Sequence, residues 1–249
     1  PNFQFMLDSL ASKDTTSHTP LDLRINSFIM RRSSFSFDQH FKPRTEGLFN
    51  LAHLRFYRVN ADINLRTLTD DSLNVNIKRL ECHEQSGLDI ERISLKLNAG
   101  KRSALLTQLQ VALPSSLLQI DTLSAGYQFE SQRLVPGSLS FYGMIKDSGI
   151  TPSDLRCFNH SFKNFQRQIL ANSQFNGTDR KLTIPSLSIA TEEKDIDILA
   201  SGSIEDWQHQ PVWHVEMNHA NLSESNIDFC VKSFPQIPRE ITRIGSLKL

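Results

Sequence analysis

The chain lacks an excess of charge of either sign and any long apolar run. Its 249 residues carry 27 Lys plus Arg against 27 Asp plus Glu, so the formal net charge is zero. That balance offers no basic surface for phosphate backbones, which argues against nucleic acid as a partner. Its most apolar stretch, 104–113, is interrupted by Thr107, Gln108 and Gln110 and falls short of the roughly 20 residues that a membrane-spanning helix needs. With 39% apolar residues, the composition lies in the globular range.

The three cysteines define no site. Cys82, Cys157 and Cys230 cannot all pair with one another, and their spacing matches no zinc pattern. We interpret them as small buried apolar side chains, an interpretation that leaves the redox compartment open.

The motifs of common enzyme chemistry are also missing. The chain has no Walker-type phosphate loop, no dinucleotide-binding glycine fingerprint, no Gly-x-Ser-x-Gly elbow and no His-Glu-x-x-His helix. Its densest cluster of reactive residues, Cys82-His83-Glu84, stands where a strand runs into a Ser86-Gly87 turn, and we interpret it as a solvent-exposed strand end. The sequence therefore predicts no catalytic, metal or cofactor site.

What the chain does contain is alternation of apolar and polar residues at period two, typical of strands with one buried and one wet face. Turn-forming residues separate these segments at intervals of about 10 residues, which favours an antiparallel meander. The alternating residues include Leu21, Leu23 and Ile25; Ile63 and Leu65; Leu73, Val75 and Ile77; Ile93, Leu95 and Leu97; and Leu109, Val111 and Leu113. The predicted turns are 70–72, 86–87, 98–100, 114–116, 136–137 and 176–177.

A finer apolar pattern contains a two-residue step. It fits the segments 54–61, 88–95, 118–125 and 182–189, as in Leu54, Phe56, Val59 and Ala61. Such a step requires a bulge, bend or corner, which we expect to send later side chains to the other face. We therefore predict a mainly β fold: an elongated, curved antiparallel β-groove, a repeating open trough rather than a closed sandwich.

Short amphipathic helices interrupt this pattern. Thr151 and Pro152 open one predicted helix. Ser223 caps a second, which Pro235 ends. The segment 153–155 resembles 225–227 at an offset of 72 residues, so we expect each helix to begin a new structural unit. The apolar positions are Leu155, Phe158, Phe162 and Phe165 in the first, Ile227, Cys230, Val231 and Phe234 in the second, and Phe3, Met6, Leu7 and Leu10 in a third at the start of the chain.

We read the chain as one continuous piece of a longer protein, with four parts. Residues 1–20 form a short helix and linker, 21–150 a β-meander groove, 151–222 a helix followed by strands, and 223–249 a helix and the start of a further β unit. With only two or three short helices to cover so many one-sided strands, the apolar face is left for another occupant.

A lipid tail would suit such a face. Removing about 15 methylenes from water is worth on the order of 12 kcal/mol before ordering costs, so binding needs no polar motif. The residues that we expect to line the groove are Ile93, Leu95, Leu97, Leu109, Val111, Leu113, Leu123, Tyr127, Leu187 and Ile189.

Several stretches resemble the TamB branch of the AsmA-like proteins, particularly forms from the Bacteroides group. They are LDLRINSFIMRRSSFSFD, LNVNIKRLECHEQSGLDIERISLKL, LPSSLLQIDTLSAGYQF, SDLRCFNHSFKNF and LTIPSLSIA. The resemblance implies a segment of a periplasmic protein of a Gram-negative bacterium, anchored in the inner membrane and reaching toward an outer-membrane partner of the TamA or BamA kind. It implies a β-groove that shields phospholipid acyl chains for outer-membrane biogenesis, and no enzymatic activity.

Two alternatives remain at this stage. The first is a periplasmic scaffold or chaperone that assists outer-membrane protein assembly by strand pairing, which Pro114, Pro136, Pro185 and Pro211 disfavour. The second is a closed carbohydrate-binding sandwich, for which Trp207, Trp213 and three tyrosines provide no obvious aromatic cluster.

Overall fold

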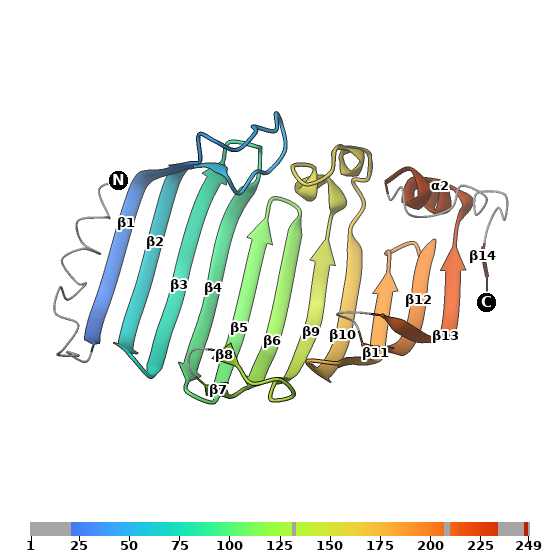
Figure 1. The fold of residues 1–249 in the computed structure, drawn as a ribbon. Helices are drawn as coiled ribbons and strands as arrows, with labels where there is room; N and C mark the ends of the chain where they lie inside the picture. The colour runs from blue at the N-terminus through green and yellow to red at the C-terminus, as the bar shows by residue number, and fades with distance from the viewer. Residues whose placement is uncertain (1–20, 131–132, 207–209, 234–246, 249) are drawn as a thin grey trace.

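A computed structural model describes residues 21–130, 133–206, 210–233 and 247–248, and within them the chain forms one open antiparallel sheet. Its twelve strands lie side by side in a single layer, and the colour order in Figure 1 shows that neighbours in sequence are neighbours in space. The first and last strands of the sheet do not pair. The mainly β, curved and open antiparallel fold predicted from the alternation is therefore confirmed.

The strands follow one another as a meander. They are β1 (Asp22–Asp38), β2 (His53–Thr69), β3 (Ser72–Glu84), β4 (Asp89–Gly100), β5 (Ser103–Leu113), β6 (Ser116–Gly126), β9 (Ser140–Ile150), β10 (Ile169–Thr178), β11 (Lys181–Ala190), β12 (Ile196–Glu205), β13 (Val212–Leu222) and β14 (Leu247–Lys248). A separate two-stranded hairpin, β7 (Phe129–Glu130) and β8 (Arg133–Leu134), lies between β6 and β9 in sequence.

The strands are longer than the predicted spacing of turns suggested, and two predicted turns are wrong. Residues 98–100 end β4, and Asn176 and Gly177 lie inside β10. At Gly177 the reason is close packing: a Cβ there would lie 2.6 Å from Cζ of Phe141 and 3.1 Å from Cα of Leu182. Glycine here marks a close approach between strands rather than a turn.

The two-residue steps are bulges, but they do not send later side chains to the other face. In β2 the step contains Arg58, whose φ of 52° lies in the left-handed region. The register shifts there, so that Phe56 pairs with Phe35 and Val59 with Ser33, and both apolar residues of β2 keep to one side. Gln108 in β5 (φ 56°) has the same role. The extra residue absorbs the change in alternation, so one face stays apolar along the whole strand.

The predicted helix from Thr151 is instead two short 3₁₀ helices, η1 (Pro152–Leu155) and η2 (His160–Asn164). The Thr151 side chain donates to the carbonyl of Ser115, 2.8 Å away, rather than capping a helix. The second predicted helix is present as α2 (Glu224–Ser233), directly after Ser223. Phe234, Pro235 and the predicted helix in residues 1–20 lie outside the described residues.

Buried apolar residues gather toward the end of the strands where η1, η2, α2 and the 39–52 loop lie, which we call the capped end (Figure 1). Across the rest of the sheet most apolar side chains are only partly buried, because the described residues supply no second layer. The buried apolar residues in the described ranges are Val59, Ala61, Cys82, Cys157, Phe165, Ile196, Ala220 and Ile227.

Candidate functional site

Strand register places one row of apolar side chains after another on the same side of the sheet. Paired residues of antiparallel strands point to the same face. One row runs through Ile63, Ile77 and Leu95, and then through Ile120, Ile145 and Leu187 after local bulges. A neighbouring row runs through Leu65, Val75, Leu97, Leu106 and Leu123. We call the surface formed by these rows and their paired residues from β1 to β13 the apolar face.

The opposite face is polar. Asn64 pairs with Asn76, and Asn74 pairs with Asn98. Charged residues of the same strands, such as Lys96, also lie on this side, because Lys96 alternates with Leu95 and Leu97. The rows of the apolar face defined above contain no charged side chain. The sheet is therefore amphipathic from β2 to β4, whereas farther along the opposite face also carries exposed leucines, Leu105, Leu117, Leu170 and Leu199.

Nine of the ten residues predicted to line a groove lie on the apolar face by register. None of the ten is buried and none is fully exposed. Tyr127 differs: it follows β6, and its hydroxyl donates to the carbonyls of Gly100 and Ser103 at 2.8 and 3.1 Å. The nine are Ile93, Leu95, Leu97, Leu109, Val111, Leu113, Leu123, Leu187 and Ile189.

The prediction missed many members of the same face. Ile63, Ile77, Ile120 and Ile145 occupy the same rows, and period-two alternation in β2, β3, β6 and β9 is the signal that identifies them. It also missed the outermost part on β13, where Trp213, Val215 and Met217 are exposed by 64%, 68% and 45%.

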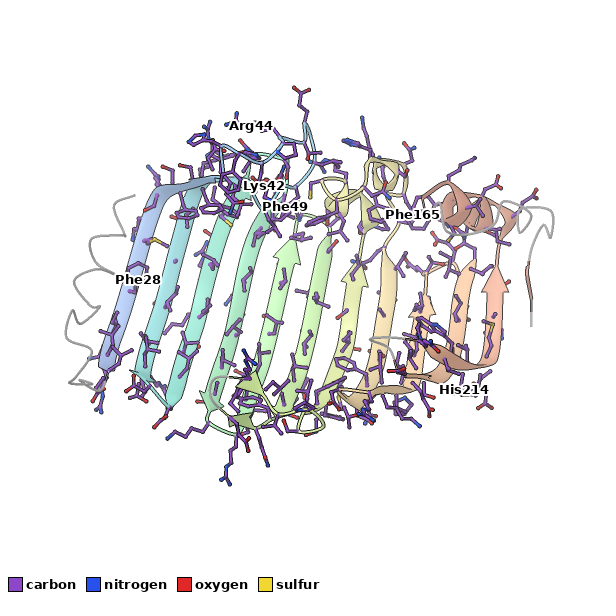
Figure 2. All side chains as sticks on the ribbon, viewed as in Figure 1. Phe28, Lys42, Arg44, Phe49, Phe165 and His214 are labelled. Atoms are coloured by element: carbon purple, nitrogen blue, oxygen red, sulfur yellow. The ribbon has the colours of Figure 1, made fainter. Side chains whose placement is uncertain are left out.

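At the capped end, the loop between β1 and β2 contacts the segment that follows η1. The 39–52 loop reaches the segment after η1, where the amide of Phe49 donates to the carbonyl of Cys157 at 2.8 Å and the Phe49 and Phe158 rings lie 5.1 Å apart. Figure 2 shows Lys42, Arg44 and Phe49 gathered there, with Phe28 farther along β1. A pocket of about 430 Å³ beneath this loop has a largely polar lining that includes Asp38, Arg44 and His53.

Cys82-His83-Glu84 is not a solvent-exposed strand end. Cys82 and Glu84 are buried, since the capped end covers the β3–β4 turn. Glu84 accepts hydrogen bonds from the amides of Arg55 (3.2 Å) and Ser86 (2.8 Å) and from the Ser86 hydroxyl (2.5 Å). His83 remains partly exposed and bonds Asp89 at 2.6 Å. The glutamate therefore has the structural role of holding the turn.

A second polar network fixes α2 to the sheet. The Asn226 side-chain amide donates to the Asp195 carboxylate at 2.9 Å and to the Ser223 hydroxyl at 2.8 Å, and it accepts from Arg167 at 2.7 Å. Partial burial pushes the pKa of Asp195 upward, but hydrogen bonds from Thr191, Arg167 and Asn226 outweigh it and hold that pKa at about 2. Within the segment 192–195, the first three residues are exposed and Asp195 alone is partly buried.

The sequence offset of 72 residues has a structural counterpart. β9 ends at Ile150 and β13 at Leu222, and a cap follows each. In the first cap Asp154 accepts from the amide of Ser115 (2.9 Å) and the hydroxyl of Ser116 (2.6 Å), at the turn of the β5–β6 hairpin. Asn226, 72 residues later, binds the β11–β12 turn through Asp195. Each cap thus attaches a helical segment to a hairpin with the help of a buried polar side chain at the equivalent position.

The described residues contain no group of three or more His, Cys, Asp or Glu side chains arranged to hold a metal ion. Cys82 and Cys157 are buried and Cys230 is partly buried, and burial raises the pKa of all three thiols. Within the same ranges, no helix has the length and apolar character needed to span a bilayer.

Comparisons with known proteins identify no relative: no family model, curated protein or solved structure matches this chain.

Proposed function

We propose that this chain is a segment of a periplasm-spanning lipid conduit that shields phospholipid acyl chains for outer-membrane biogenesis. The acyl chains lie against the apolar face, and the headgroups remain in water. The parent protein is anchored in the inner membrane of a Gram-negative bacterium, and an outer-membrane protein of the TamA or BamA kind is its partner through parts outside this chain. The chain catalyses no reaction and uses no cofactor.

One observation carries the proposal: a wide sheet has an uncharged apolar face that no second layer covers within the described residues. Closed β-sandwiches bury such a face against another sheet. Here aliphatic side chains such as Leu95, Val111 and Leu187 stay partly accessible in the middle of the sheet. An exposed apolar surface of this extent marks a binding surface.

The rows also have the direction that a conduit needs. They run across the strands from β1 to β13, so an acyl chain lying along a row contacts one or two side chains from each strand that it crosses. Each methylene removed from water contributes about 0.8 kcal/mol. Lipid can therefore shift along a row while it exchanges similar contacts.

The test is to express the chain in cells, to purify it in contact with their membranes, and to examine the purified protein by native mass spectrometry. Retained phospholipid, identified after extraction, is the expected result. Protein that is folded by circular dichroism and carries no phospholipid would overturn the proposal.

The strand-pairing alternative is favoured by one observation. β1 has 17 residues and pairs only with β2 among the described residues, and none of the four prolines named above lies in it. Such an edge can receive a strand from another chain. Site-specific crosslinks from β1 to unfolded outer-membrane proteins, in the absence of retained lipid, would support this function instead.

A further inference from the structure

The pairing of β9 with β10 places glycine opposite phenylalanine twice. Phe141 pairs with Gly177, and Gly143 pairs with Phe175. All four residues lie on the apolar face, because Gly143 also pairs with Leu123 and Phe141 with Ala125 on β6. The two rings are neighbours, with centroids 6.5 Å apart and planes inclined at 54°.

The Phe175 ring covers Gly143. A Cβ added at Gly143 would lie 2.6 Å from Cε2 and 2.8 Å from Cε1 of that ring, with Cζ closer still. These distances are too short for any real Cβ, so the tip of the ring occupies the space that a side chain at residue 143 would take. The ring is therefore folded down against β9, where only a glycine admits it.

This arrangement affects how far the side chains of the apolar face project from the sheet. A phenylalanine side chain that projects directly from a strand reaches farther from the sheet than the leucines beside it. Folded onto Gly143, the ring of Phe175 fills a gap in the row between Leu123 and Ile184. Farther along, Gly202 pairs with Ile184 and has no side chain to project. The side chains of this row therefore project only a short distance from the sheet between β6 and β12.

We propose that Gly143 sets how far the apolar face projects where β9 pairs with β10. It does so by letting the Phe175 ring lie flat beneath a passing acyl chain. This inference rests on the proposed lipid-conduit function and specifies one crossing at which a side chain could obstruct the acyl chain. An added methyl group at residue 143 would push the ring outward into the path of the hydrocarbon. Gly143 and Phe175 together are then positioning residues for the lipid rather than contacts of the core.

The test compares phospholipid retained by the full chain with that retained by Gly143→Ala, using native mass spectrometry of protein purified from membranes. We expect Gly143→Ala to lose most of the bound phospholipid. The matched control is Gly100→Ala, because a Cβ at Gly100 meets its nearest atoms at 3.8 and 4.0 Å without a clash. It should bind as the wild type does. Equal retention by folded Gly143→Ala and the wild type would overturn the inference.

A second pair of variants separates ring displacement from damage to the strand. In Gly143→Ala with Phe175→Ala the obstructing ring is absent, so retention should return to the wild-type level; continued loss would contradict the inference. Phe175→Ala alone keeps the glycine and should retain at least as much lipid as the wild type, and a fall would likewise contradict it. Phe175→Ala alone tests the inference if Gly143→Ala does not fold. If the wild type itself retains no phospholipid, the proposed function fails first.

Discussion

The middle of the apolar face and the capped end belong to the same strands, yet they are held in different ways. In the middle, aliphatic side chains such as Leu95 pair with neighbours within one layer and remain partly accessible. At the capped end, buried Glu84 and Asn226 join loops and helices to the strand ends through several hydrogen bonds each. Tertiary stability is thus concentrated at one end, which leaves the rest of the apolar face open to a ligand.

The largest loss of stability is expected from Glu84→Ala. It removes the acceptor for two backbone amides and one hydroxyl at a buried turn, so the free energy of unfolding should fall by about 3 kcal/mol. Urea unfolding followed by circular dichroism measures this. Glu91→Ala is the control, because Glu91 is exposed on β4, and it should change stability by less than about 0.5 kcal/mol. Similar values for the two variants would show that the capped end is not the stable part.

A smaller loss is expected from Asn226→Ala, at about 2 kcal/mol. The variant leaves Arg167 and Asp195 with fewer partners and loosens α2 from the β11–β12 turn. Hydrogen exchange should rise in α2 and in the 191–196 turn and stay unchanged at the β3–β4 turn. A uniform increase over the whole sheet would contradict the separation of the two caps.

Acid should weaken the same network. The pKa of Asp195 is about 2 in the folded chain, below its ordinary value of 3.8. A lowered folded-state pKa contributes stability that is complete above the unfolded value and is lost as pH falls toward the folded one. The difference in melting temperature between the wild type and Asp195→Asn should therefore hold steady near neutral pH and shrink between about pH 4 and pH 2. A difference that does not depend on pH would show that the carboxylate charge is not what stabilises α2.

The sequence predicted the parts of this fold that depend on local pattern. Alternation identified the strands, and nine of ten chosen residues share one face, because side-chain direction in a strand follows directly from period two. The bulge at Arg58 was predicted, but the one at Gln108 was not, nor was it predicted that both would keep the same face apolar, since this depends on the register of a neighbouring strand.

The caps could not be predicted in the same way. Phe158 and Phe162 stand at helical spacing, yet contacts with the 39–52 loop and the hairpin turns favour two 3₁₀ helices over one α-helix. Cys82 and Glu84 are buried at the capped end, where Arg156 reaches the β3–β4 turn from a distant part of the chain, and no local pattern signals such a contact. The role of Gly143 likewise becomes visible only once Phe175 is placed opposite it.

The most direct test of the central claim compares adjacent substitutions on opposite faces of β4. Leu95→Asp places a charge on the apolar face, and Ser94→Asp places one on the polar face. Both should keep their strand content by circular dichroism, with unfolding free energies within about 1 kcal/mol of the wild type. Native mass spectrometry should show phospholipid retained by the wild type and Ser94→Asp and lost from Leu95→Asp. Global unfolding of Leu95→Asp, or equal lipid retention by the two variants, would contradict the account.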